Sequence, residues 1–302
     1  MKRITLILGA ALLFAGFAQA AEKPLIRIGA RVFTEQTILA EITAQYLESK
    51  GYKTRITAGL GSNLARQAQE TGQLDLMWEY TGVSLVAYNH VDERMTDPAA
   101  TYALVKKLDS EKDLIWLAPS RFSNTYALGL PRKVAEAYPQ IDTISQLSQA
   151  LRDEKDRKHL VALDTEFANR PDGLVGLKET YDLQVGRENI RQMNSGLVYT
   201  ALRNNQAFCG LVYTTDGRLD AFGIKLLEDD KHYFPDYTAA PVIRKQLLDA
   251  SPELAGLLKP LAEALDGDTM RHLSAQADVE HRSPRLVAAE FLREHPISEV
   301  QP

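Results

Sequence analysis

The amino-acid sequence predicts an α/β protein built from two lobes with a cleft between them. From residue 25 to about residue 227, short apolar segments alternate with segments of helical periodicity, a pattern typical of strand–helix units. There are more of these units than one compact sheet needs, and a helical C-terminal tail follows them. A single large sheet made from the same elements is the alternative arrangement.

Residues 1–20 have the composition of a secretory signal peptide. A positively charged start, Met1 to Arg3, precedes an apolar core from Ile4 to Phe17, and residues 18–20 (AQA) form a small-x-small cleavage site. The apolar core is too short to span a membrane comfortably, which argues against a membrane anchor. No cysteine follows the cleavage site, so lipid attachment is excluded there. We therefore expect export to the periplasm.

The composition of the remaining chain excludes several classes of protein. The formal net charge of −5 becomes more negative by two charges when Lys2 and Arg3 are removed, and no basic stripe is present, so nucleic acid is not an expected partner. No later stretch has the roughly 18 consecutive apolar residues of a membrane-spanning helix. The single cysteine, Cys209, has apolar neighbours and is expected to be an unreactive core thiol.

The first strand–helix units follow from apolar runs that end in turn residues. Leu25 to Gly29 is predicted to be a strand, and the helix after it begins with Thr34 as N-cap and ends at Gly51. The next elements are expected to be strands at 54–58, 74–79 and 114–117, with helices at 64–70, from 81 to about 90, and from Asp97-Pro98 onward. Alternation at this spacing predicts a parallel sheet.

The second half of the chain repeats the alternation and then becomes helical. A loop from 123 is predicted to lead into a strand ending at 130, and residues 166–173 to form a loop rich in helix breakers. The other expected strands lie at 161–163, 208–213 and 226–227, and the helices at 134–138, 145–151, from 174, 198–204, 244–250, 254–265, 269–277 and 284–294.

Signatures of enzymes are absent from the sequence. There is no phosphate-binding loop with lysine, no G-x-S-x-G and no H-E-x-x-H, and residues 59–61 (GLG) supply only two glycines of a dinucleotide fingerprint. The six histidines lack metal-ligand spacing. We therefore expect neither catalysis nor a cofactor or metal, although a catalytic triad dispersed along the chain stays open.

Four of the twelve tyrosines lie in or beside turns, at the edge of a strand or where the chain crosses between lobes. They are Tyr80, Tyr126, Tyr213 and Tyr237. The ends of strands in an open α/β sheet are where such proteins bind ligands. Packing or a place on the surface is the ordinary explanation for any one of these rings, and their shared placement alone does not establish a joint binding role.

Five short segments, in a fixed order, carry a resemblance to a known family. They are residues 33–36 (FTEQ), 79–82 (EYTG), 124–128 (NTYAL), 170–173 (RPDG) and 213–217 (YTTDG). The chain resembles the substrate-binding proteins of ABC importers for compatible solutes such as glycine betaine, proline betaine, choline and carnitine. The similarity covers nearly the whole mature sequence and is greatest to the periplasmic branch called osmoprotectant-binding.

The resemblance implies a type II-like clamshell of two α/β lobes joined by two crossover segments. One lobe would comprise residues 25–124 plus 234–302, and the other residues 125–233. Tyr80 and Tyr237 would come from the first lobe, Tyr126 and Tyr213 from the second, so that a four-tyrosine cage is complete only when the lobes close. The family also implies a monomer that delivers its solute to an inner-membrane ABC permease and its ATPase.

Such a cage suits a quaternary ammonium ion, which has a permanent charge and no N–H donor. Aromatic faces offer it negative quadrupole charge and apolar contact together. By family position, Arg31 and Arg170 are the expected partners of a betaine carboxylate, with Gln36 and Asn124 as polar supports.

Two positions depart from the family pattern. Lysine is frequent where this chain has Arg31, and threonine where it has Val83, so the valine removes a hydroxyl that could bond the polar end of a ligand. A binding protein of the same fold for another small solute, such as an amino acid, is the alternative function.

Overall fold

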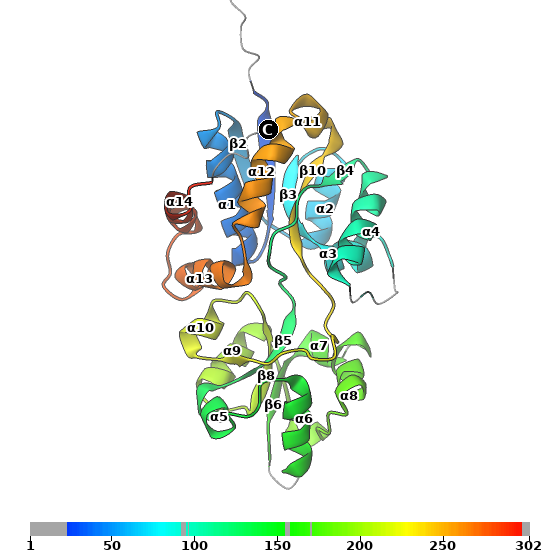
Figure 1. Ribbon diagram of the computed structural model, residues 1–302, viewed down its shortest axis with the longest axis vertical. Helices are drawn as coiled ribbons and strands as arrows, with labels where there is room; N and C mark the ends of the chain where they lie inside the picture. The colour runs from blue at the N-terminus through cyan, green and yellow to red at the C-terminus, as the bar shows by residue number, and fades with distance from the viewer. Residues whose placement is uncertain (1–22, 92–94, 96, 155–157, 170, 298–302) are drawn as a thin grey trace, which may run out of the picture.

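The computed structural model describes residues 23–91, 95, 97–154, 158–169 and 171–297. In this part of the chain ten strands form two five-stranded sheets, one in each of two α/β lobes (Figure 1). The two-lobed prediction is confirmed, and the alternative of a single sheet is wrong. The predicted signal peptide, residues 1–20, lies outside the described residues. No helix of the described part is long and apolar enough to cross a membrane.

The sheet of the first lobe has the strand order β2-β1-β3-β10-β4. These strands are β1 (Leu25–Arg31), β2 (Lys53–Leu60), β3 (Leu76–Tyr80), β4 (Leu114–Trp116) and β10 (Ala239–Arg244). Strands β1, β2 and β3 are parallel, whereas β10 runs antiparallel to both β3 and β4. The predicted all-parallel sheet is therefore wrong at β10, a strand that the sequence interpretation missed.

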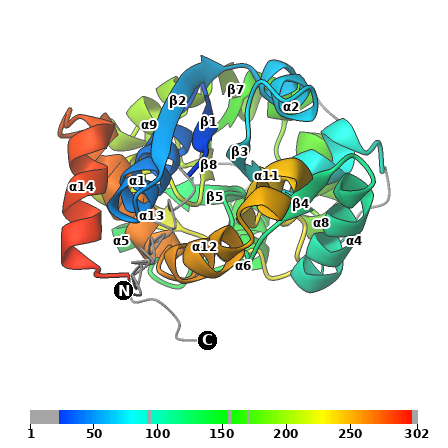
Figure 2. The same cartoon turned by 90° about the horizontal axis from the view of Figure 1, so that it is seen from above.

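Helices cover this sheet, and α1 and α14 lie side by side (Figure 2). The helices of this lobe are α1 (Thr34–Ser49), α2 (Ser62–Glu70), α3 (Thr81–Val83), the π-helix η1 (Ser84–Tyr88), α4 (Pro98–Ser110), α11 (Lys245–Ala250), α12 (Glu253–Glu263), α13 (Gly267–Asp278) and α14 (Pro284–Glu294). Helix α4 begins at the predicted position, and Asp97 caps it by accepting from the backbone amide of Ala99 at 2.9 Å. Thr34 is not the N-cap of α1: Phe33 holds that position, and the Thr34 hydroxyl donates to Asp278.

The sheet of the second lobe has the order β7-β6-β8-β5-β9. Its strands are β5 (Tyr126–Leu130), β6 (Val161–Asp164), β7 (Ile190–Met193), β8 (Cys209–Tyr213) and β9 (Lys225–Leu226). The helices are α5 (Arg132–Ala137), α6 (Ile144–Asp153), α7 (Thr165–Asn169), the π-helix η2 (Pro171–Val175), α8 (Gly176–Tyr181), the 3₁₀-helix η3 (Arg187–Asn189), α9 (Ser195–Arg203) and α10 (Arg218–Phe222). Helix α7 occupies part of the predicted loop at 166–173, and the sequence interpretation missed β7 and α10. Cys209 lies buried in the core, as predicted.

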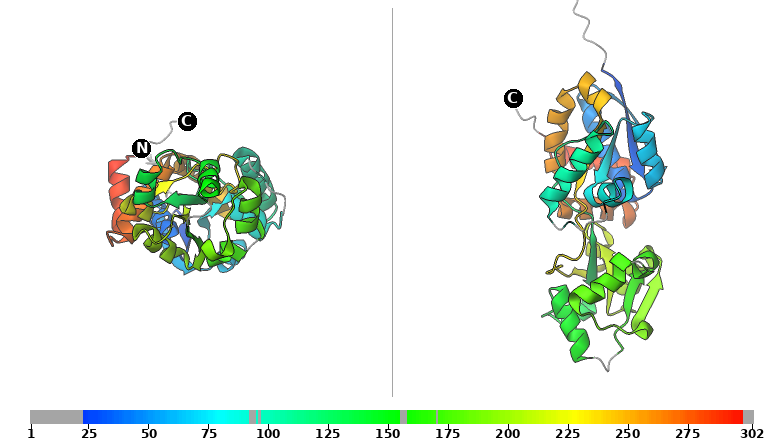
Figure 3. Two further views of the ribbon diagram at one scale, coloured as in Figure 1. Left: turned by 90° about the horizontal axis from the view of Figure 1, so that it is seen from below. Right: turned by 90° about the vertical axis from the view of Figure 1, so that its right-hand side faces the viewer.

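Two crossover segments join the lobes and lie against each other (Figure 3). One runs from β4 to β5 and the other from β9 to β10. Ser123 and Thr238 form an antiparallel bridge between them, and the backbone amide of Asn124 donates to the backbone carbonyl of Tyr237 at 3.2 Å. These contacts fix residues 123–126 and 237–239 next to each other, at the level where the lobes face one another.

The lobes also touch away from the crossovers, where α10 packs on α13 (Figure 1). Gly217 precedes α10, and a Cβ atom on it would lie 2.1 Å from the backbone nitrogen of Ala275 in α13. Arg271 of α13 donates to the Thr214 carbonyl at 3.1 Å. Only a glycine permits this close approach of the two lobes.

A candidate solute-binding site between the lobes

A cavity of about 900 Å³ lies between the lobes. The predicted site residues that line it come from both sheets and from the crossovers: Arg31, Tyr80, Asn124, Tyr126, Tyr213 and Tyr237. Strands β1 and β3 are parallel neighbours and end at the same edge of their sheet, which brings residues 31–35 and 80–83 together. The structure thus places all four predicted tyrosines around one space.

Three of the tyrosines form a cluster, two from the second lobe and one from the second crossover, which packs against the core of the first lobe. Tyr126 and Tyr213 are directly opposite in the antiparallel pair of β5 and β8, so their side chains lie on the same face with ring centroids 5.2 Å apart. Tyr237, from the second crossover, lies edge-on to Tyr126 at 6.4 Å. All three are half-buried, which leaves ring surface open to the cavity.

Tyr80 forms the opposite wall, on the side of the first lobe. It is only 3% exposed, and its ring lies 6.2 Å from that of Phe33. Its hydroxyl donates to a carboxylate oxygen of Glu35 and accepts from the Gln36 side-chain amide at 3.2 Å. Burial, together with the nearby Glu35 charge, raises the pKa of Tyr80 well above its usual value, so the phenol stays protonated.

Arg31 lies in the wall of the cavity with its charge already matched. Its Nη2 atom is 2.6 Å from Glu79, and both side chains are 2% exposed. The guanidinium also lies 5.0 Å from the centroid of the Tyr80 ring. Burial alone would lower the pKa of Arg31, but the charges of Glu79 and its neighbours outweigh burial and raise it. Arg31 therefore remains a cation that orients Glu79 and stacks on Tyr80.

The other predicted polar residues differ in their placement. Asn124 lines the cavity and donates to Glu35 at 3.0 Å. Gln36 stands behind the cavity wall, where it bonds the Tyr80 hydroxyl and, at 3.1 Å, the Trp78 carbonyl. Arg170 lies outside the described residues.

Several lining residues were not predicted as site residues from sequence. They include Phe33, Glu35, Val83, Thr215, Asp216 and Arg218, of which Val83 had been noted only as a departure from the family pattern. Arg218 is paired with Asp216 at 2.5 Å. Glu35 and Phe33 belong to the FTEQ segment and Asp216 to the YTTDG segment, so the signal was present but did not say which side chains face the cavity. No cluster suited to a metal ion occurs among the residues that the structure describes.

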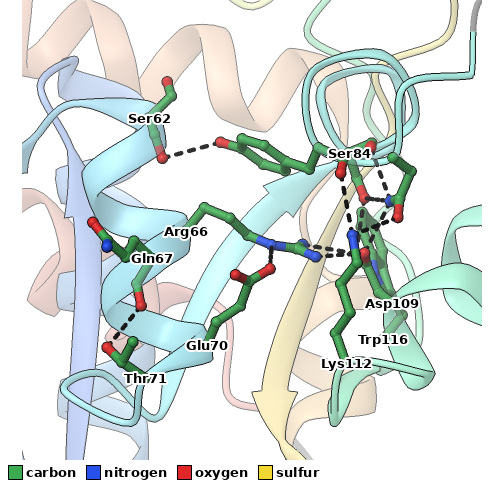
Figure 4. A network of polar contacts seen from close by, with 11 residues as sticks. Ser62, Arg66, Gln67, Glu70, Thr71, Ser84, Asp109, Lys112 and Trp116 are labelled. Atoms are coloured by element: carbon green, nitrogen blue, oxygen red, sulfur yellow. Dashed lines mark hydrogen bonds and ion pairs between the residues drawn. The ribbon is translucent and has the colours of Figure 1, made fainter.

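A buried polar network supports the part of the wall that carries Val83 (Figure 4). Asp109 of α4 is fully buried and accepts two bonds from Arg66, at 2.7 and 3.0 Å. It also accepts from the Ser84 hydroxyl at 2.8 Å and from the Trp116 indole at 2.7 Å. Because Ser84 begins the π-helix directly after Val83, the network fixes this irregular turn beside the cavity.

Two α/β lobes, paired crossovers and a cavity lined from both sides define a two-lobed solute-binding protein. A family model described as the substrate-binding domain of ABC-type glycine betaine transport systems matches residues 24–294. The chain belongs to this family, as the five segments predicted. It is accordingly a substrate-binding component of an ABC transporter and not an enzyme.

Individual relatives are similar over nearly their whole length. The glycine-betaine-binding protein of Pseudomonas aeruginosa is 53% identical over 290 residues, 95% of this chain and 92% of the relative. The carnitine transport binding protein OpuCC of Listeria monocytogenes is 32% identical, over 91% of this chain and 88% of its own. The solved structure of apo YehZ from Escherichia coli superposes with a TM-score of 0.78 at 30% identity, covering 89% of this chain and 98% of that one.

Proposed function

We propose that this protein captures a quaternary-ammonium solute in a cage of Tyr80, Tyr126, Tyr213 and Tyr237. In this proposal the lobes, residues 25–124 with 234–302 and residues 125–233, close around the solute in the periplasm after removal of the signal peptide. The closed monomer then presents the solute to an inner-membrane ABC permease driven by its ATPase. The observation that carries the proposal is that four tyrosines from both lobes and a crossover line one cavity.

The energetics of a cage suit this ligand class. A desolvated cation–π contact contributes roughly 0.5–2 kcal/mol, so four rings supply about 2–8 kcal/mol. Micromolar affinity requires about 8 kcal/mol before the cost of closure is counted, so the other end of the solute must contribute. Asn124 and Arg31 line the cavity. Together with Arg170 they remain the proposed contacts of that end.

Glycine betaine and carnitine are the first solutes to test, because relatives with those names are similar over nearly the whole chain. Val83 faces the cavity with a side chain that cannot donate a hydrogen bond. A missing hydrogen bond to a charged group costs about 1.5–3 kcal/mol, so we expect glycine betaine to bind more weakly here than to relatives with threonine at this position.

The test is calorimetric titration of glycine betaine, carnitine, choline and an amino acid such as proline into the mature protein and two variants. Tyr213→Leu removes one ring of the cage and should weaken binding of a quaternary-ammonium solute about tenfold, about 1.4 kcal/mol. Tyr213→Phe keeps the ring and should change affinity less than about threefold. Tyr138→Leu is the matched control, because Tyr138 is half-buried in the same lobe but does not line the cavity.

Two outcomes would count against the cage. Equal affinities for the wild type and Tyr213→Leu would remove this ring from the site. Saturable binding of the amino acid with no response to any quaternary-ammonium solute would favour the alternative, a binding protein of the same fold for another small solute.

A further inference from the structure

Glu35 is the cavity residue whose chemistry the tyrosine cage does not explain. It lies in the first turn of α1, is 5% exposed and lines the cavity. One of its carboxylate oxygens accepts from the Tyr80 hydroxyl and from Asn124. The other oxygen is buried and has no hydrogen-bond partner within the described residues.

The nearby basic side chains are already paired with other carboxylates. Arg31 is paired with Glu79 and Arg218 with Asp216, at 2.6 and 2.5 Å. No basic side chain of the described residues forms an ion pair with the Glu35 carboxylate, whose support comes from the hydrogen bonds of Tyr80 and Asn124 and from the more distant charge of Arg31. A buried charge without a counter-ion is costly, and a cation entering the cavity would offset that cost.

We propose that Glu35 is a further binding-site residue, whose carboxylate acts as the counter-ion of the solute's ammonium group and makes the closed form selective for a cation over a neutral molecule of equal shape. The proposal rests on the proposed function and extends it, because rings alone also accommodate a neutral apolar group. Glu35 holds the Tyr80 hydroxyl, so its charge stands immediately behind one wall of the cage.

The same arrangement gives binding a dependence on pH. Burial raises the pKa of Glu35, and the nearby hydroxyl of Thr215, the hydrogen bonds from Tyr80 and Asn124 and the charge of Arg31 oppose that rise without cancelling it. The other charged groups that line the cavity are Asp216, Arg218 and Asp278. A bound cation favours the ionised carboxylate, so affinity should fall as pH falls through the pKa of Glu35 in the free protein, which lies above the usual range of glutamate.

The experiment compares each solute with its carbon isostere. Glycine betaine is paired with 3,3-dimethylbutanoate, and choline with 3,3-dimethylbutan-1-ol; in each isostere a neutral carbon replaces the ammonium nitrogen. Affinities are measured by calorimetry from about pH 5 to pH 8, for the wild type and Glu35→Gln. Glu41→Gln is the matched control, since it removes the same charge from the same helix at a position that does not line the cavity.

Glu35→Gln should weaken glycine betaine or choline about tenfold, which corresponds to about 1.4 kcal/mol. Binding of the neutral 3,3-dimethylbutan-1-ol should change less than about twofold, and binding of the anionic 3,3-dimethylbutanoate should stay the same or become stronger. The variant should also lose the pH dependence that the wild type and Glu41→Gln show. Equal losses for a solute and its isostere would overturn the counter-ion role and leave Glu35 as a support for Tyr80.

A thermal melt shows whether Glu35→Gln is folded. If it is not, the pH dependence of wild-type affinity still tests the counter-ion role of Glu35. A constant affinity would overturn the proposal, because the charge of Glu35 would then make no contribution to binding. An affinity that rises on acidification would overturn it as well, because the protonated form of Glu35 would then bind the solute better. If neither quaternary-ammonium solute binds the wild type, the proposed function itself fails, which is a separate result.

Discussion

Replacing Gly217 by alanine should weaken solute binding while leaving each lobe folded. The backbone at Gly217 has φ −62° and ψ −18°, which alanine adopts without strain. The added methyl group, however, would lie 2.1 Å from the nitrogen and 2.4 Å from the Cα atom of Ala275 across the lobe interface. Normal contacts between such atoms are about 3.5–4.0 Å, so α10 and α13 must separate by more than about 1 Å.

The size of the effect follows from the contacts that a partly open cleft loses. When the lobes cannot approach fully, the solute held by one lobe loses the rings of Tyr126 and Tyr213, or those of the opposite wall. Two cation–π contacts amount to about 1–4 kcal/mol. The affinity of Gly217→Ala should therefore fall by a factor of roughly 5 to 700.

Calorimetric titration and a thermal melt of the unliganded protein separate binding from folding. Gly256→Ala is the control, because a Cβ there meets nothing within 4 Å and the residue lies in α12. That change should stabilise the protein by up to about 1 kcal/mol without altering affinity. Wild-type affinity in Gly217→Ala, with an unchanged melting temperature, would refute the idea that this contact belongs to the solute-bound form.

Two further predictions concern the cores of the lobes. Asp109→Ala should destabilise the first lobe by about 3–5 kcal/mol in a urea titration, because it leaves Arg66 buried without its partner; a loss under about 1 kcal/mol would contradict this. Burial alone would raise the pKa of Asp109, but the hydrogen bonds and charge of Arg66 lower it. The stabilisation that Asp109 contributes should therefore be present above its unfolded-state pKa of about 3.9. It should be lost as pH falls through the lower pKa of the folded state. Burial raises the pKa of Cys209 to about 12, so a thiol reagent should label it only under denaturing conditions, and fast labelling of the native protein would contradict its burial.

Most strand–helix units were predictable from the sequence because they obey local rules of periodicity and capping. Strand β10 was not, because Pro241 lies within it and a proline argues against a central strand. It is tolerated opposite Trp78, and its carbonyl accepts from the Leu117 amide at 2.9 Å, so pairing with distant segments decides the outcome. Helix α7 lies in a segment that the sequence interpretation took for a loop. Its formation also depends on tertiary packing, because Phe167 is buried in the core of the second lobe.

The residues of the site also differ in whether local sequence signals predict them. The four tyrosines could be found from their placement at strand ends together with the family resemblance. The ionic partners could not, because ion pairing depends on register and burial: the parallel pairing of β1 with β3 is what brings Arg31 to Glu79. Glu35 was visible only as an acidic residue favourable in a first helical turn, and its burial against Tyr80 and Asn124 appears only in three dimensions.

The most direct test of the account is a crystal structure of the mature protein with glycine betaine or choline bound. The account predicts the ammonium nitrogen within about 6 Å of the ring centroids of Tyr80, Tyr126, Tyr213 and Tyr237, with rings of both lobes in contact with the same solute molecule. A solute bound to one lobe alone, or an ammonium group outside the four rings, would contradict it.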